Sequence, residues 1–189
     1  MVAIGQLRYL WLAELTIVIV GLATLAGCSR GPVAPALEDG PEFRDAQEGF
    51  RFLVPEHWTQ YAHAAVPPGR LTDERMIVEY NLQAVAKPAS FGVTCVDLDP
   101  STDIAKYVAS HVPGGASWKL KAPSKPCEIQ GVPAEKMTFV SHPPGADELT
   151  RDIVAFRRGQ RVYLFTGVYA TSDKEAREQV QQAMDSILW

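Results

Sequence analysis

Short stretches in which apolar and polar residues alternate occur along most of the chain after residue 49. Alternation with a period of two is typical of strands that bury one face. The first stretch ends at Pro55, and the third ends at an Asp-Leu-Asp-Pro sequence, as expected of strands that run into turns. In the second, the even-numbered residues from Met76 to Leu82 are expected to share one face. The pattern predicts strands over residues 50–54, 76–82 and 91–97.

The second half of the chain predicts a strand over residues 134–141 and then a hairpin. The hairpin pairs residues 149–156 with residues 161–169, and Gly159 at its tip can supply the positive φ of a tight turn. Its second strand is apolar on both faces, so the sheet requires cover on both sides. The residues concerned are Val162, Leu164 and Val168 on one face and Tyr163, Phe165 and Tyr169 on the other.

Two segments have the apolar spacing of an amphipathic helix. The first, over residues 101–111, begins after an Asp-Pro sequence that can cap a helix. The second begins with a capping box, with Ser172 as N-cap and Glu175 at N3, and its apolar face must lie on a sheet. Strands and helices together predict an α+β fold in which helices cover a mostly antiparallel sheet.

The first 27 residues have the organisation of an export signal. The apolar run over residues 15–27 is about a dozen residues long, which suits a secretory signal and falls short of the roughly 20 that span a bilayer. Extending the run upstream would place Glu14 in the membrane, which is costly. Residues 1–27 are therefore expected to be a cleaved signal peptide.

The end of this segment resembles a bacterial lipoprotein signal, because Leu25-Ala26-Gly27-Cys28 matches the lipobox. The resemblance implies cleavage before Cys28, a diacylglycerol on its thiol and often a further acyl chain, such as palmitate, on the new amine. The residue after the cysteine is Ser29 and not an aspartate. By resemblance to the sorting preference of such lipoproteins, this implies that the protein is anchored on the periplasmic side of the outer membrane rather than in the inner membrane, if the cell has both. An ordinary signal peptide with an incidental cysteine, or a buried helix, is the alternative.

Residues 28–42 are rich in proline, glycine and alanine and lack apolar periodicity, which is typical of a flexible tether. At about 3.1 Å per residue, the roughly 14 residues after the cysteine reach about 40 Å. Residues 43–189 are enough for one domain with a core of its own.

Composition narrows the class of partner. The formal net charge is −4 and no strongly basic face is evident, which disfavours nucleic acid. Of three cysteines, Cys95 and Cys127 remain if Cys28 is lipidated. They form either a disulfide, worth about 3–4 kcal/mol for a loop of about thirty residues, or two buried free thiols. Their spacing leaves both alternatives open.

Four features of residues 43–189 occur together in one known family: Gly49-Phe50-x-Phe52-x-Val54-Pro55-x-x-Trp58, Ile129-Gln130-Gly131-Val132-Pro133-Ala134, Tyr163-x-Phe165 and the C-terminal helix. Their order resembles the PsbP-like (Mog-type) α/β/α sandwich. Family members bind partners, including photosystem subunits and a small GTPase, and are generally not enzymes. The resemblance therefore implies a non-catalytic binding domain without a cofactor, and it carries over no family binding residue.

Sequence motifs of common catalytic sites are absent: G-x-S-x-G, H-E-x-x-H, the Walker A loop and G-x-G-x-x-G. His57 and His63 are close enough to share a metal with a third ligand, although surface histidines explain them more simply. Asp97, Asp99 and Asp103 have part of the calcium-loop spacing but lack its glycine and final glutamate, and a helix start explains them as well. No metal site is expected.

Arg157, Arg158 and Arg161 give the predicted hairpin a basic tip. Such a tip would suit anionic lipid headgroups, a cell-wall polymer or an acidic patch on a partner. Alternatively, the charges keep a sheet edge soluble, and nearby carboxylates neutralise them.

These features predict a non-catalytic, lipid-anchored protein of the cell envelope whose domain binds an envelope protein or supports complex assembly. The alternative is a small apolar or anionic ligand in a cleft between sheet and helix, and an unrecognised hydrolase is a third class. Trp58 is expected to pack in the core or at its rim. Aromatic residues that could line a cleft, and that core packing explains equally well, are Tyr61, Tyr80, Trp118 and Tyr163.

Overall fold

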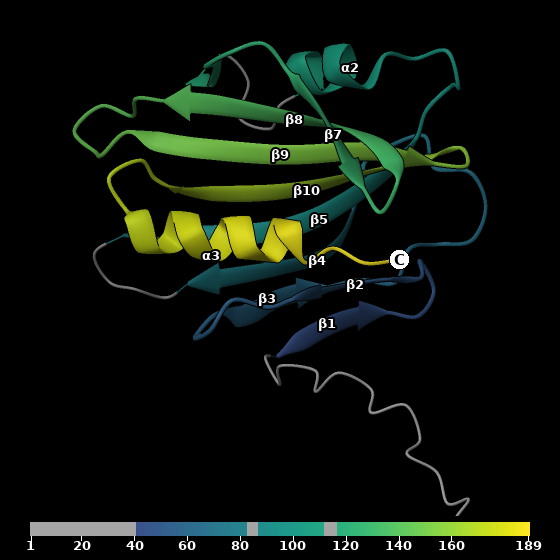
Figure 1. The fold of residues 1–189 in the computed structure, drawn as a ribbon, viewed down its shortest axis with the longest axis horizontal. Coiled ribbons are helices and arrows are strands. Elements are labelled where there is room, and N and C mark those ends of the chain that lie inside the picture. Colours follow the sequence, from purple (N-terminus) through teal and green to yellow (C-terminus); the bar gives the residue numbers. More distant parts are fainter. Residues whose placement is uncertain (1–40, 83–86, 112–116) are drawn as a thin grey trace, which may run out of the picture. The chain divides into compact units, whose positions relative to one another are not determined.

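The computed structural model describes residues 41–82, 87–111 and 117–189 (Figure 1). The expected signal peptide, the Cys28 lipidation site and residues 28–40 of the expected tether lie outside these ranges. Within them, no helix is both long and apolar enough to cross a membrane. The structure therefore bears on the expected domain and not on the expected anchor.

The described residues form a strand-rich domain in which every strand pair is antiparallel. The main sheet has the order β3-β4-β5-β10-β9-β8-β6, with β7 also paired to β8, and β1 and β2 form a separate hairpin. The predicted α+β class, mostly antiparallel, is confirmed. The elements are β1 (Glu42–Asp45), β2 (Phe50–Leu53), β3 (Thr59–His63), β4 (Arg75–Leu82), β5 (Ala89–Asp97), α2 (Ile104–His111), β6 (Lys119–Leu120), β7 (Lys125–Ile129), β8 (Val132–Ser141), β9 (Leu149–Arg158), β10 (Arg161–Ala170) and α3 (Lys174–Asp185).

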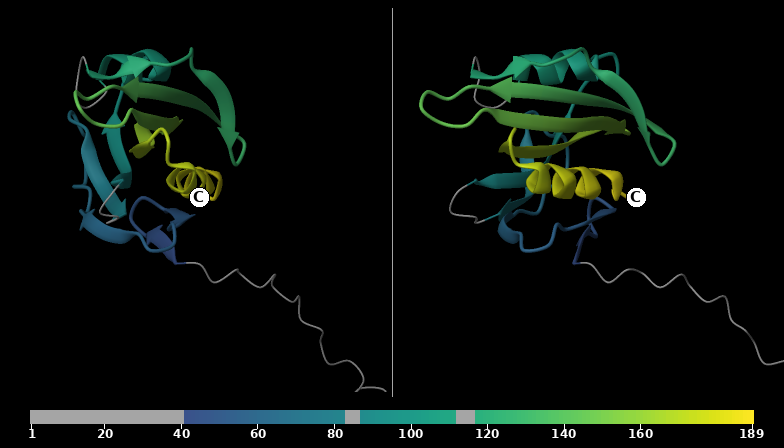
Figure 2. Two further views of the ribbon diagram at one scale, coloured as in Figure 1. Left: turned by 90° about the vertical axis from the view of Figure 1, so that its left-hand side faces the viewer. Right: turned by 60° about the vertical axis from the view of Figure 1, so that its left-hand side comes forward.

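The sheet curves around α3, and the β1–β2 hairpin lies on the same side, whereas α2 lies on the opposite face (Figure 2). The core beneath α3 is rich in aromatic rings: Phe52 and Phe91 have centroids 5.2 Å apart, and Phe165 lies 5.4 Å from Phe50. A second, smaller core contains Val108 of α2. Both faces of β10 are thus covered from Val162 to Phe165, as its apolar pattern predicts, whereas Thr166 and Val168 are only partly buried on the α2 side.

A close approach of helix to sheet fixes the position of α3. Ala176, Val180 and Ala183 are buried on its inner side. Gly167 of β10 lies directly opposite Val180, and a Cβ atom at position 167 would overlap the Val180 side chain. The absence of a side chain at Gly167 therefore lets the helix axis come close to the strand.

Three local predictions are wrong, each for a physical reason. The first helix begins at Ile104 with Asp103 as its cap, because the Asp99 carboxylate bonds to Ser101 in a preceding turn. The register shifts between Met76 and Val78, so Ile77 and Val78 are both fully buried while Met76 is exposed. This irregularity breaks the strict alternation that the sequence predicts. The N-cap of α3 is Asp173 instead of Ser172, and its carboxylate accepts a hydrogen bond of 3.1 Å from the backbone N–H of Ala176.

Trp58 packs at the rim of the larger core, as expected, with 8% of its surface exposed. Its indole N–H donates a hydrogen bond of 2.6 Å to Oε1 of Gln179 on α3. The tryptophan therefore links the segment after β2 to the covering helix.

Cys95 of β5 and Cys127 of β7 lie on one row across the sheet, with strands β10, β9 and β8 between them. Neighbouring strands are about 4.8 Å apart, and a disulfide requires Cα atoms within about 7 Å. Both thiols are free, with Cys95 buried and Cys127 partly exposed. The disulfide alternative therefore does not fit this fold, and the free-thiol alternative does.

Candidate functional site

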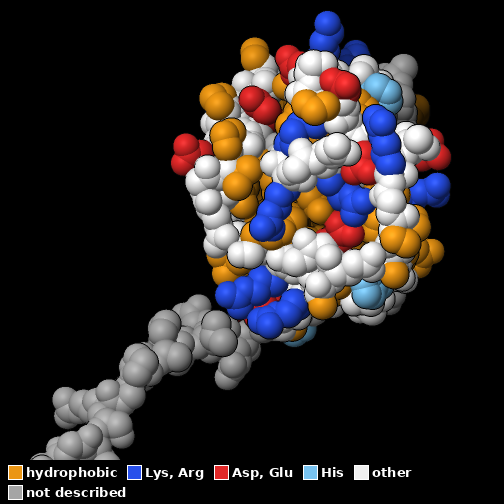
Figure 3. All heavy atoms as spheres, turned by 90° about the vertical axis from the view of Figure 1, so that its right-hand side faces the viewer, with side chains coloured by type: hydrophobic (Ala, Val, Ile, Leu, Met, Phe, Trp, Pro, Cys, Tyr) orange, Lys and Arg blue, Asp and Glu red, His pale blue; other side chains and the backbone are white. Residues whose placement is uncertain are grey.

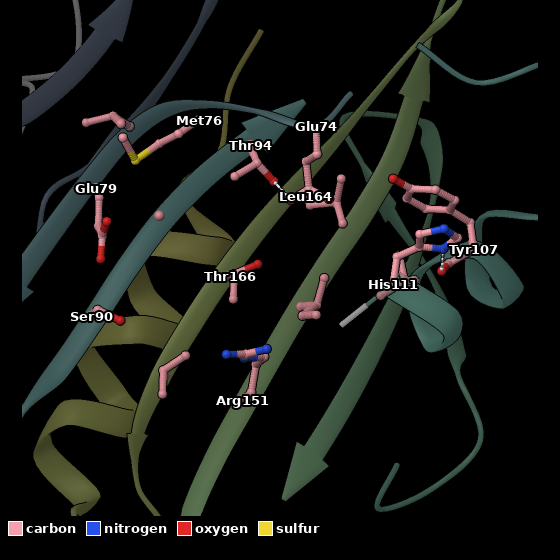
Figure 4. Close-up of a pocket in the computed structure, with 15 residues that line it drawn as sticks. Glu74, Met76, Glu79, Ser90, Thr94, Tyr107, His111, Arg151, Leu164 and Thr166 are labelled. Atoms are coloured by element: carbon pink, nitrogen blue, oxygen red, sulfur yellow. Dashed lines mark hydrogen bonds between the residues drawn. The ribbon is translucent and has the colours of Figure 1, made fainter. Parts of the chain in front are cut away.

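A pocket of about 260 Å³ lies on the sheet face that carries α2, and we call it the α2 pocket (Figure 4). The helix packs on β8 and β9 and leaves β4, β5 and the end of β10 uncovered on this face. The pocket forms at the boundary between the covered and uncovered parts. Its apolar lining consists of Met76, Val78, Tyr107, Val108, Ile153, Leu164 and Val168.

The β9–β10 hairpin positions α2 through one arginine. The Arg157 guanidinium donates hydrogen bonds of 2.8, 3.1 and 3.2 Å to the backbone carbonyls of Leu98, Asp99 and Thr102, which precede the helix. The carboxylate of Asp103 then accepts a hydrogen bond of 3.0 Å from the N–H of Lys106 and caps the first turn. Arg157 and the Asp103 cap together fix the position of α2, which forms one wall of the pocket.

Small side chains form the floor of the pocket. Gly92 of β5 faces Thr166 of β10, which faces Ile153 of β9. The neighbouring row consists of Ser90, Val168 and Arg151, in the same strands. Because Gly92 lacks a side chain and its neighbours are short, the surface is hollowed at this point.

The polar groups of the pocket are of mixed charge. Glu74 and Glu79 lie on the β4 side, and Arg151 rises from the floor (Figure 4). The Arg151 guanidinium carbon lies 4.1 Å from the ring centroid of Trp118, a cation–π contact. Burial lowers the pKa of Arg151, and the charge of Glu74 partly offsets this effect.

The α2 wall carries an aromatic pair. The rings of Tyr107 and His111 stack with centroids 4.3 Å apart, and burial raises the pKa of the Tyr107 phenol. Nδ1 of His111 lies 2.9 Å from the Ser110 hydroxyl, which also donates to backbone carbonyls of the helix. This serine and histidine are exposed neighbours at the helix end, and among the residues that the structure describes no acid bonds to the His111 ring, as a catalytic pair would require. The arrangement is suited to binding.

The predicted basic tip is engaged within the domain. Arg157 holds the segment before α2, and Arg161 pairs with Glu48 at 2.8 Å and with Asp97 at 3.1 Å. The Arg158 guanidinium carbon lies 4.9 Å from the ring centroid of Trp189. Figure 3 views this end of the domain, where lysine and arginine side chains are interspersed with acidic and apolar ones. All three arginines thus have contacts within the domain, and their contact with a partner or an anionic surface stays a prediction.

Four of the five residues considered for metal binding have other partners among the described residues, His57 being the exception. Nε2 of His63 lies 3.8 Å from Asp45 Oδ2. Asp97 binds Arg161 and the backbone N–H of Leu71, while Asp99 bonds to Ser101. In the part of the chain that the structure describes, no three His, Cys, Asp or Glu side chains converge as a metal site.

Of the four aromatic residues considered for a cleft, Trp118 alone lies beside the α2 pocket, through Arg151. Tyr80 and Tyr163 are buried on the α3 side, and Tyr61 is exposed on β3. The sequence analysis did not identify Arg151 or Gly92, which lie on the floor of the α2 pocket. The available signal was the set of small and polar residues inside strands that otherwise have buried, apolar patterns.

No protein-family profile matches this sequence, and no curated protein does. Solved structures match the fold. Cyanobacterial PsbP (CyanoP) from Synechocystis is 12% identical, with a TM-score of 0.54, over 84% of this chain and 99% of that one. The yeast Ran-binding protein Mog1p is 8% identical, with a TM-score of 0.55, over 79% and 95%. A Pseudomonas aeruginosa protein of unknown function, PA94, is 21% identical, with a TM-score of 0.50, over 70% and 97%. The α+β sandwich of this chain is therefore similar to PsbP and Mog1p.

Proposed function

With this PsbP- and Mog1-like fold as the starting point, we propose that the chain is a lipid-anchored protein of the cell envelope whose domain binds a protein partner and catalyses no reaction. The lipobox that ends at Cys28 supports the anchor, and Ser29 supports the outer membrane over the inner one. That Mog1p is a Ran-binding protein supports partner binding as a use of the fold.

The observation that carries the binding role is the α2 pocket at the edge of an uncovered sheet face. Its volume of about 260 Å³ is below the roughly 300–1,000 Å³ of typical small-molecule sites. This size suits one apolar side chain of a partner. Met76, which is 37% exposed, extends the apolar surface beyond the pocket, and Glu74 and Glu79 suit basic residues around the inserted side chain.

A small organic molecule is the second candidate, favoured by Arg151. A guanidinium beside an apolar wall can bind a carboxylate whose apolar part lies on Leu164 and Val168. The carboxylates of Glu74, just before β4, and Glu79 in β4 oppose such an anion, and we therefore rank the protein partner first.

The test is site-specific photocrosslinking in cells. A photoreactive amino acid replaces Met76 at the pocket, and in a control it replaces the exposed Glu178 of α3, on the other face. We expect one dominant envelope protein attached at position 76 and absent at position 178. The same products at both positions, or none at position 76, would overturn the proposed partner site.

The anchor is tested separately. A Cys28→Ala chain lacks the thiol that receives the lipid, so it is expected to lose the mass of the acyl groups and to leave the membrane fraction after signal cleavage. Retention of the cleaved Cys28→Ala chain in the membrane fraction would contradict lipidation at this residue.

A further inference from the structure

A second hollow lies on the opposite face of the sheet, beside α3, with a volume of about 650 Å³. Its two sides are α3 and the segment from Lys121 to Lys125 that leads into β7, and its floor is formed by β8, β9 and β10. Figure 1 shows β7, into which this segment leads, and α3 in front of the sheet. We call this hollow the strap groove.

Four cationic side chains surround the strap groove, whereas the whole chain has a net charge of −4. Lys121 and Lys125 come from the segment that leads into β7, Lys136 from β8 and Arg177 from α3. Within the described residues, none of the four has a carboxylate oxygen within 4.0 Å. Positive charge is thus concentrated here without local neutralisation by ion pairs.

The floor of the strap groove carries one acid and several hydroxyl groups. Asp152 accepts hydrogen bonds of 2.5 Å from Thr138 and 2.6 Å from the Tyr169 hydroxyl, one on each carboxylate oxygen. Thr150, only 5% exposed, shares a hydrogen bond of 2.8 Å with Thr171 at the same end. One internally bonded carboxylate against four cations leaves the groove with a local charge excess of +3.

We propose that the strap groove binds a phosphate group. A phosphate group bears close to two negative charges when free and one in a diester headgroup, and in both forms its acceptor oxygens match lysines and an arginine that approach from the two sides and the floor. The exposed Lys121, Lys125 and Arg177 can reorient to a ligand without disturbing the core. The phosphate belongs either to a free molecule or to a lipid headgroup, and both sources present the same chemistry to the groove.

The test titrates the full chain, purified in a neutral detergent, by calorimetry at low ionic strength. Inorganic phosphate and pyrophosphate probe the free source, and short-chain phosphatidylglycerol probes the headgroup, with the zwitterionic short-chain phosphatidylcholine as its reference of zero net charge. The site variant carries Lys121→Gln, Lys125→Gln and Arg177→Gln. A matched control carries Arg44→Gln, Arg75→Gln and Lys106→Gln, which removes the same charge at exposed positions elsewhere.

We expect the wild-type and control chains to bind at least one phosphate probe, and the site variant to bind it at least tenfold more weakly. Binding should weaken as salt is raised. If the chain binds pyrophosphate or phosphate, the ligand is assigned as a free phosphate-bearing molecule. If it binds phosphatidylglycerol alone, the ligand is assigned as a lipid headgroup. Equal binding by the site variant, an equal loss in the control, or no binding of any probe would overturn the proposal. All three chains should share one thermal unfolding midpoint, since the substituted side chains are exposed.

Discussion

The guanidinium of Arg161 donates two hydrogen bonds of 2.8 Å to the two carboxylate oxygens of Glu48, 113 positions earlier in the chain. The Glu48 side chain is 5% exposed and also accepts a hydrogen bond of 2.7 Å from the Tyr163 hydroxyl. Arg161 reaches Asp97 at 3.1 Å as well. One arginine thus ties the β1–β2 turn to β5 and β10.

Removing this arginine is expected to destabilise the domain strongly. Arg161→Met leaves Glu48 buried without its cation, a change that costs about 3 kcal/mol or more in buried pairs. The free energy of unfolding, measured by urea denaturation, should fall by that amount. The control is Arg158→Met, at the position paired with Arg161 across the hairpin. This change loses only an exposed contact with Trp189, so the free energy of unfolding should fall by about 1 kcal/mol or less. Equal losses would contradict the buried-pair account.

The close packing of α3 on β10 predicts a suppressor pair. Gly167→Ala places a Cβ atom against Val180 and should lower stability by about 1–3 kcal/mol through overpacking. Val180→Ala removes the opposing methyl groups, so the double variant should be more stable than the sum of the two single changes predicts. Thermal and urea unfolding of the four chains measure this coupling. Strict additivity would show that the two residues do not meet.

The floor of the α2 pocket can be filled without disturbing the core. A Cβ atom at position 92 would lie 3.4 Å from the backbone oxygen of Val78, an ordinary contact, so Gly92→Ala should change the unfolding free energy by about 0.5 kcal/mol or less. The crosslinked product formed from position 76 should nevertheless decrease severalfold, because the hollow is shallower. An undiminished product in a stable Gly92→Ala chain would exclude the floor from the binding site.

The two domain cysteines are expected to react separately with an alkylating agent. Burial raises the pKa of Cys95 to about 12, and burial also raises the pKa of the partly exposed Cys127. Because the thiolate is the reactive form, alkylation of the native chain should begin at Cys127 and accelerate as pH rises. Mass spectrometry after denaturation without reductant should show both thiols alkylated. A chain that resists alkylation until it is reduced would indicate a disulfide.

Alkaline pH should unfold the domain through its buried tyrosines. Burial, and in each case a hydrogen bond to a carboxylate, raises the pKa of Tyr163 and of Tyr169 well above 10. Both groups are neutral in folded and unfolded chains below about pH 10; above it the unfolded chain loses protons that the folded chain retains. Stability should therefore decline above about pH 10, by up to about 1.4 kcal/mol per pH unit for each tyrosine. Tyr163→Phe should reduce that slope, and an unchanged slope would contradict the assignment.

The sequence by itself determined the parts whose signal is local. Alternation predicted the α+β class and the β9–β10 hairpin, because side chains in a strand repeat every two residues whatever the partner strand is. The apolar stripe of α3 and the two apolar faces of β10 required helical cover on both sides of the sheet. The lipobox at Cys28 is likewise a local pattern, and its lipidation remains a prediction.

Tertiary structure alone decided which residues meet. Three arginines close together in sequence have different partners, because strand pairing brings distant segments beside them. Arg157 bonds to the carbonyls before α2, Arg158 contacts Trp189, and Arg161 pairs with Glu48 and Asp97. Cys95 and Cys127 are separated by three strands that are inserted from later in the chain. The two hollows depend on how far each helix extends across a curved sheet. Chain spacing contains none of this information, since contacts across a sheet are set by strand order and register.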